Sequence, residues 1–125
     1  MNAGDTFIDG LYNHLWIVLS DPATDRDNIV VVNVTSYHAE VHQEHAQCVL
    51  VQADHSFIKH KSVVRFEDCL VVAEADYEVL VRGNQMTPHR ACSAALLKKV
   101  RKEAGNLRKR IPGKARRILE DQDLI

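Results

Sequence analysis

Short apolar runs, separated by polar turns, dominate the first 85 residues of the chain. The strongest run, residues 29–35, has six of its seven positions apolar or β-branched, which predicts a strand buried on both faces or lying in a tightly curled sheet. Further strands are predicted at residues 15–19, 48–51, 62–66 and 69–73, and residues 77–81 fit either a last strand or a turn of helix.

The spacing of these strands indicates the fold class. Parallel strands need a crossover of about a dozen residues or more, usually a helix. The first 85 residues contain no helical pattern between the apolar runs. Five or six short strands in this arrangement predict a mainly β protein, built as a small closed or half-closed barrel.

The pattern becomes helical near the end of the chain. Thr87 and Pro88 fit a helix start, and no proline or glycine interrupts residues 89–104 before the stop signal at Gly105. Pro112 opens a second short helix. We therefore expect a barrel at 1–85 and a helical extension at 86–125, forming one compact domain of 125 residues in total.

The charge of −1 divides unevenly between these parts. Residues 1–97 hold 6 Lys/Arg and 13 Asp/Glu, a balance of −7, and residues 98–125 hold 10 and 4, a balance of +6. The basic part begins with Lys98, Lys99, Arg101 and Lys102. These side chains are candidates for RNA backbone contact with strong salt dependence, or for a solvated helix face that lies against the acidic body.

Several classes of protein do not fit the sequence. No apolar run approaches the ~18 residues of a membrane helix. The first residues show no signal-peptide pattern, so a cytoplasmic location is expected. Cys48, Cys69 and Cys92 lack metal or redox spacing and are expected to be reduced, buried thiols. Neither a glycine-rich phosphate loop nor a nucleophile elbow is present, and no cofactor is expected.

The densest polar cluster spans residues 54–62 and contains His55, His60 and Ser62 with Lys59 and Lys61. Two histidines can act as base and acid in RNA cleavage by 2′-hydroxyl attack, while lysines hold the phosphate. His55 and His60 are five residues apart, so they meet only if the chain turns between them. The alternative is that His55 and Ser62 are hydrogen-bonded turn and strand-end residues.

A second histidine cluster lies at residues 38–45. His38, His42 and His45, with two glutamates, could bind zinc if the segment were helical. The spacing does not match a His-Glu-x-x-His motif, so an exposed loop is the preferred interpretation and no metal site is predicted.

Three segments in order suggest a family: Gly4-Asp5-Thr6-Phe7, then residues 14–20 (HLWIVLS), then residues 30–36 (VVVNVTS). They resemble the core of the PemK/MazF-like toxins over residues 4–72, and residues 54–62 (DHSFIKHKS) are similar to a divergent branch of that family. The resemblance implies an SH3-like β-barrel with a C-terminal helix, often a homodimer in the cytoplasm. It also implies metal-independent cleavage of single-stranded RNA and inhibition by an antitoxin protein.

The resemblance also assigns candidate catalytic residues. His14-Leu15 stands where the toxins carry a catalytic Arg-Pro pair, and Thr35 or Ser36 matches the second catalytic group of the family. A histidine can serve as the acid but supplies no permanent charge. We therefore expect an endoribonuclease of a toxin–antitoxin or defence module, with a non-catalytic barrel that binds protein or nucleic acid as the alternative.

The roles expected in the enzymatic version follow from these matches and from the polar cluster. His55 or His60 is the base, His14 is the acid, and Thr35, Ser36 and Ser62 orient the phosphate. The residues expected to bind the RNA strand are Lys59, Lys61, Arg65, Lys98, Lys99, Arg101 and Lys102.

Overall fold

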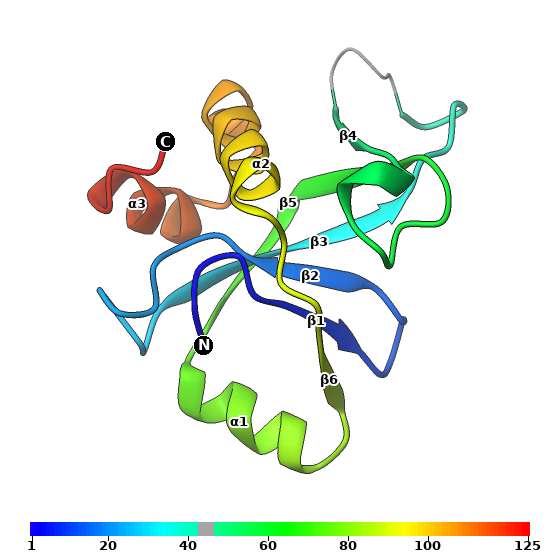
Figure 1. The fold of residues 1–125 in the computed structure, drawn as a ribbon. Coiled ribbons are helices and arrows are strands. Elements are labelled where there is room, and N and C mark those ends of the chain that lie inside the picture. Colours follow the sequence, from blue (N-terminus) through cyan, green and yellow to red (C-terminus); the bar gives the residue numbers. More distant parts are fainter. Residues whose placement is uncertain (43–46) are drawn as a thin grey trace.

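The computed structural model of the chain describes residues 1–42 and 47–125, and within them six strands form one antiparallel sheet (Figure 1). The order across the sheet is β4-β5-β3-β2-β1-β6. The strands are β1 (Thr6–Asp9), β2 (Leu15–Val18), β3 (Ile29–Ser36), β4 (Cys48–Leu50), β5 (Ser62–Val72) and β6 (Met86–His89). The mainly β class is confirmed, but the sheet remains open and does not close into the predicted barrel.

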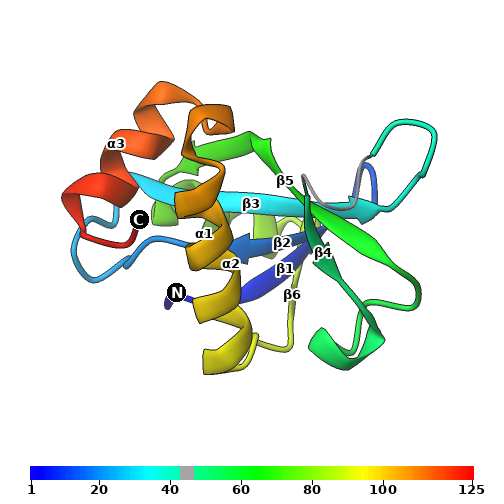
Figure 2. The ribbon, with the colours of Figure 1, turned by 90° about the horizontal axis from the view of Figure 1, so that it is seen from above.

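Helices cover both faces of the sheet. Helices α2 (Ala94–Asn106) and α3 (Gly113–Asp121) lie over one face, and α1 (Glu74–Arg82) lies on the other side (Figures 1 and 2). Short 3-10 turns, η2 (Gln52–Asp54) and η3 (Arg108–Arg110), connect other elements. None of the helices described within 1–42 and 47–125 is long and apolar enough to cross a membrane.

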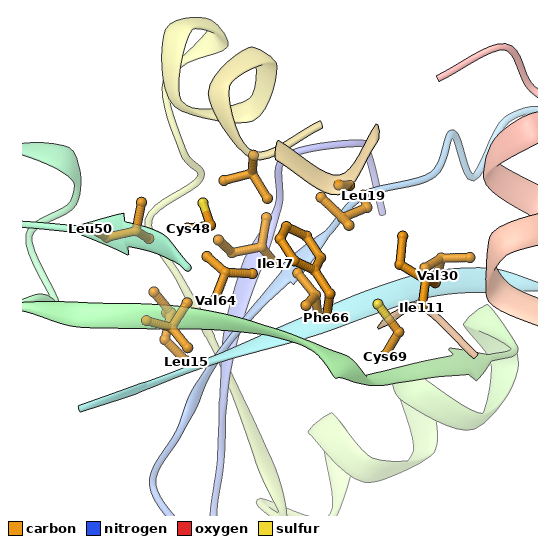
Figure 3. Close-up of a cluster of buried hydrophobic side chains, with 14 of the residues drawn as sticks. Leu15, Ile17, Leu19, Val30, Cys48, Leu50, Val64, Phe66, Cys69 and Ile111 are labelled. Carbon is orange, nitrogen blue, oxygen red and sulfur yellow. The ribbon is translucent and has the colours of Figure 1, made fainter. Parts of the chain in front are cut away.

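Strand β3 is central and contributes to two apolar cores. Val30, Val32 and Val34 belong to the larger core beneath α2 and α3, whereas Ile29 and Val31 belong to a smaller core with Phe7 and Val18. Figure 3 shows the larger core, in which side chains from neighbouring strands gather around Phe66. Because alternate residues of a strand point to opposite faces, burial on both sides explains the nearly continuous apolar run.

Strand β5 is one long strand, where two were predicted at 62–66 and 69–73. The polar pair Glu67-Asp68 resembles a turn, but here it is the exposed part of an irregularity in the ladder. On β3 the step from Val31 to Asn33 lies opposite the step from Leu70 to Arg65 on β5. A bulge of this kind bends a strand without ending it.

The start of the C-terminal helix was predicted wrongly. Thr87 and Pro88 lie in β6, which pairs with β1 at the edge of the sheet, where proline's missing N–H is tolerated. Helix α2 begins at Ala94, and the Ser93 hydroxyl caps it by accepting the Leu96 amide at 3.1 Å. One strand of the sheet thus comes from the range 86–125, while the end of α2 and the existence of α3 agree with the sequence analysis.

The three cysteines are free thiols, as expected. Cys48 and Cys69 are buried in the larger core, and burial raises the pKa of both to about 12. Cys92 is half-buried and its pKa is also raised by burial. Thiols with such pKa values are poor nucleophiles and act as small apolar side chains.

Candidate functional site

A groove of about 460 Å³ lies at the end of the sheet where β3 finishes and where β2 and β5 begin. Its described lining comes from the β1–β2 turn, the end of β3, the loop between η2 and β5, and the first residue of β5. Five of the six predicted catalytic residues line this groove: His14, Thr35, Ser36, His60 and Ser62. Lys59 lines it as well.

Strand register brings these distant residues together. Leu15 pairs with Val34, so the residues before β2 and at the end of β3 reach the same end of the sheet. Ser36 pairs with Ser62, which adds the start of β5 to this end. The groove therefore results from the antiparallel pairing of β2, β3 and β5, with polar residues where each strand begins or ends.

His60 is exposed in the groove and its ring is held by a neighbouring hydroxyl. The Ser36 Oγ and the His60 Nε2 are 2.7 Å apart. The buried Ser62 hydroxyl donates to the backbone carbonyl of His60 at 2.9 Å, which fixes the loop on which the imidazole stands. The imidazole and the hydroxyl beside it are therefore placed where they can exchange a proton with a ligand in the groove.

His14 is carried by a turn that Asp9 organises, and Asp9 was not singled out in the sequence. The Asp9 Oδ1 accepts the amides of Leu11 and Tyr12 at 3.1 and 2.6 Å. The Asp9 Oδ2 accepts the Trp16 indole N–H at 2.8 Å and the His14 amide at 3.3 Å. An aspartate before a glycine at a strand end is turn chemistry, and this signal could have identified the residue.

These hydrogen bonds also determine the ionisation of Asp9. Burial raises the pKa of this carboxyl, but the hydrogen bonds from Tyr12, Trp16 and His14, together with the charge of His14, leave the pKa below its ordinary value. Asp9 is therefore a carboxylate at neutral pH. Its charge makes each of the bonds that hold the turn stronger than a neutral one.

Asn33 lies behind His14. Its side-chain amide Nδ2 is 3.5 Å from the His14 Nδ1, and the residue is only 7% exposed. Among the described residues, the Asn33 Oδ1 is buried with no hydrogen-bond partner. The amide thus lies within reach of the His14 Nδ1, and rotating it would present an acceptor in place of a donor.

His55, the sixth predicted catalytic residue, lies outside the groove. It is 6% exposed, its Nε2 donates to the Arg90 carbonyl at 2.5 Å, and its Nδ1 accepts the Phe57 amide at 3.1 Å. Both ring nitrogens of His55 are therefore engaged with backbone groups. His55 ties the loop to the segment before α2, in agreement with the turn interpretation offered as the alternative.

The His89 ring lies beside the ring of His55, with centroids 5.4 Å apart and planes tilted by 47°. Burial, followed by the charges of His55 and Lys59, lowers the pKa of His89. The His89 ring also makes an edge-to-face contact with Phe57, which lines the groove. These contacts make the His55 and His89 rings part of the wall that supports the loop.

The predicted RNA-binding residues of the sheet differ in position. The Lys59 Nζ lies near the groove and donates to the Ser56 carbonyl at 3.0 Å. The Lys61 Nζ lies 5.1 Å from the centre of the Tyr37 ring. Arg65 is paired with Glu67 and Asp68. Among the described residues, neither Lys61 nor Arg65 is part of the groove lining.

Three of the four predicted RNA-binding residues of α2 line a different hollow. Lys98, Arg101 and Lys102 surround a space of about 460 Å³ next to Asp123 and Leu124. The guanidinium of Arg101 donates twice to the Leu19 carbonyl, at 2.9 and 2.7 Å, and burial lowers its pKa. Arg101 thus fastens α2 to the Leu19 carbonyl, and Lys98 and Lys102 are the other cationic side chains in the described lining of this hollow.

Lys99 points elsewhere and joins α2 to β4. Its Nζ donates to the Val49 carbonyl at 3.1 Å and lies 3.5 Å from the carboxylate of Asp54. Val49 belongs to the edge strand of the sheet, so the lysine caps a carbonyl of that edge. In this position Lys99 has a structural role, because it binds the edge strand and not the groove.

The second histidine cluster shows no metal site in the described part of the chain. The His42 Nδ1 accepts the His38 amide at 2.9 Å, and the two ring centroids are 6.2 Å apart. No group of three or more possible ligands occurs within residues 1–42 and 47–125. His45, the third member of the cluster, lies outside the described residues.

Neither a scan against protein-family models nor a search of curated proteins finds a match to this chain. The resemblance to the PemK/MazF-like toxins therefore stays a prediction that rests on the sequence segments quoted above.

Proposed function

We propose that this chain is a metal-independent endoribonuclease that cleaves single-stranded RNA in the groove at the end of the sheet. The observation that carries the proposal is the meeting of His14, Thr35, Ser36, His60 and Ser62 in one groove with Lys59. Two imidazoles, three hydroxyls and an ammonium group match the needs of phosphate-ester cleavage. In this proposal the protein is a cytoplasmic toxin or defence enzyme, and an antitoxin protein that covered the groove would inhibit it.

The proposed reaction is attack of the RNA 2′-hydroxyl on the adjacent phosphorus. His60 takes the proton of the 2′-hydroxyl, a bond forms between the 2′-oxygen and phosphorus, and the bond to the 5′-oxygen breaks. His14 gives its proton to the departing 5′-oxygen. Thr35 and Ser36 orient the phosphate, Ser62 holds the loop of His60, and Lys59 offsets the negative charge of the transition state.

The alternative function is a non-catalytic module that uses the same groove for binding. It is favoured by His14, which stands where the toxins carry an arginine and supplies no permanent charge. The two functions differ in their products. Only the enzyme converts a long RNA into discrete fragments.

The test is to incubate the purified protein with a long unstructured RNA in EDTA and to separate the products on a gel. We expect discrete fragments from the wild-type protein. His60→Ala and His14→Ala should each lower the cleavage rate by about 10²-fold or more, as loss of a general acid or base does. His38→Ala is the matched control, because His38 is exposed and is not among the described groove residues.

His55→Ala separates the groove from its support. Since His55 hydrogen-bonds to backbone on both sides, we expect this variant to lose stability more than catalytic activity of the folded protein. RNA left intact by the wild-type protein would contradict the nuclease proposal and favour the binding module. Cleavage that persists in His60→Ala would remove His60 from the mechanism.

A further inference from the structure

A second hollow, of about 610 Å³, adjoins the candidate groove on the other side of the β1–β2 turn. It lies between this turn and the turn that joins α1 to β6, which Figure 1 shows next to each other. Apolar and aromatic side chains form most of its walls: Leu11, Tyr12, Trp16, Leu80 and Met86. Asn84 and Gln85 add polar groups.

Tyr12 joins the two spaces. It lines both the groove and the hollow, and it is 70% exposed. Its ring stacks beside the imidazole of His14, with centroids 5.9 Å apart and planes 28° from parallel. The Tyr12 amide is held by Asp9 at 2.6 Å, so an exposed aromatic ring stands on a fixed backbone at the border of the groove.

The hollow has a rigid wall. The indole N–H of Trp16 is bonded to the Asp9 carboxylate at 2.8 Å, and its ring stacks on Phe7 with planes 5° from parallel. An aromatic side chain that is held in this way offers a flat surface that is preorganised for a ligand.

We propose that this hollow is a nucleobase subsite, in which a base stacks on Tyr12 against the wall of Trp16 while the adjoining phosphate lies in the groove. The inference rests on the proposed function, since it assumes RNA as the ligand of the groove. Aromatic side chains bind the flat faces of bases in single-stranded nucleic acids. The amides of Asn84 and Gln85 offer both donors and acceptors to a base edge.

The charge of the hollow selects the base over the phosphate. Asp9 is part of its lining, and the charged side chains in the described lining include no cation. The Asp9 carboxylate would repel a phosphate there, and the described lining has no cation to offset this repulsion. An uncharged heteroaromatic ring would not be repelled. The groove on the other side of Tyr12 contains Lys59 and two histidines, so it favours the phosphate.

Trp16 is the single tryptophan of the chain and lies in the proposed subsite, so its fluorescence reports on occupancy. The experiment titrates the full-length protein with adenosine and, separately, with a single-stranded 2′-O-methyl oligonucleotide, which cannot be cleaved by 2′-hydroxyl attack. Excitation is placed at the red edge of the indole band, where bases do not absorb. We expect saturable quenching by both ligands.

Variants of Tyr12 test the stacking itself. Tyr12→Ala should weaken oligonucleotide binding by about 10- to 100-fold, and Tyr12→Phe, which keeps the ring, should retain affinity. Leu70→Ala is the control, because Leu70 is 51% exposed on β5 and is not in the described lining of the hollow. Equal affinity of Tyr12→Ala and Leu70→Ala would overturn the subsite.

The outcomes also separate the subsite from the nuclease. Quenching that depends on Tyr12, in a protein that leaves natural RNA intact, would support the base subsite and contradict the proposed catalysis. Cleavage of natural RNA, without any change in Trp16 fluorescence on oligonucleotide binding, would support the proposed catalysis and contradict the base subsite. If neither adenosine nor the oligonucleotide changes the fluorescence, the hollow does not bind bases and the inference fails.

Discussion

Asn33 is a buried amide inside the most apolar strand of the protein. Its Oδ1 lacks a partner among the described residues, and an unsatisfied buried polar group costs about 1–3 kcal/mol. Sequences that break a local rule in this way tend to do so at functional sites. The sequence shows the interruption of the apolar run, but the neighbour His14, 19 positions away, becomes visible only with the register of β2 and β3.

Asn33→Leu tests whether this amide serves the groove at the cost of stability. Leucine has the same number of non-hydrogen side-chain atoms and needs no hydrogen bond, so we expect the free energy of unfolding to rise by about 1 kcal/mol. Cleavage should fall by about 10-fold, because His14 loses the polar group that orients it. Urea unfolding and the RNA cleavage assay measure the two effects.

Two results would contradict this interpretation of Asn33. A drop in stability would mean that the amide makes a favourable interaction beyond the contact with His14. Unchanged cleavage in a stabilised variant would mean that His14 needs no support from behind.

The pair His55 and His60 shows the limit of prediction for single residues. Both belong to one polar cluster with the same residue types around them, and part of this cluster lines the groove. Which histidine faces the groove depends on the turn between them. That turn is determined by backbone contacts such as the carbonyl of Arg90, 35 residues later, which no local pattern contains.

Among the strands, those with an apolar run in the sequence were predicted, whereas β1 and the edge strand β6 were not. The segments that form β2, β3 and β4 carry clear patterns, whereas β6 has the sequence MTPH and no apolar run. Thr87-Pro88 satisfies the rules for a helix start and for an edge strand equally well. Pairing with β1 decides between them.

The β1–β2 turn is the element that carries both His14 and Tyr12, and Asp9 holds it. Asp9→Asn keeps the shape but replaces one acceptor oxygen with a donor that faces an N–H group. Since hydrogen bonds to a charged group contribute about 1.5–3 kcal/mol, we expect a loss of unfolding free energy of about 2 kcal/mol at neutral pH. Urea unfolding measures it.

The effect of Asp9 should depend on pH with a definite sign. The pKa of Asp9 in the folded protein is lowered, so its contribution to stability is complete above its unfolded pKa, about 3.9, and is lost as the pH falls through the folded value. The difference between wild type and Asp9→Asn should therefore be constant near pH 7 and shrink below pH ~4. A difference that grows in acid would show that the carboxylate does not stabilise the turn.

At the scale of the whole molecule, the groove and the hollow lined by Lys98, Arg101 and Lys102 are separate, because their described linings share no residue. The loop that borders the groove lies at one end of the sheet, and the C-terminal residues that border the hollow lie toward the other (Figures 1 and 2). The uneven charge along the sequence marked residues 98–125 as basic, and Lys98, Arg101 and Lys102 of this segment line the hollow. The charge pattern could not show that this hollow is separate from the histidines, because α2 folds back across the sheet.

This separation predicts a dependence on RNA length. An RNA long enough to leave the groove and reach α2 should gain contacts with Lys98 and Lys102, whereas a short one that fills only the groove should not. In the double variant Lys98→Ala and Lys102→Ala, the salt dependence of binding to the long RNA should weaken. Each phosphate contact on a single strand contributes about 0.7 to the slope of log affinity against log salt, so the slope should fall by about 1.4.

The matched control is Lys114→Ala with Arg117→Ala, which removes the same charge from exposed positions of α3. Binding is measured by fluorescence anisotropy with labelled RNAs of two lengths over a salt series. If the control lowers the slope as much as the α2 variant does, the attraction is a property of the net charge rather than of the hollow. If the short RNA responds as strongly as the long one, the strand does not follow a path from the groove to α2. A response confined to the long RNA and to the α2 lysines would establish that path, because neither net charge nor the groove alone can distinguish the two lengths.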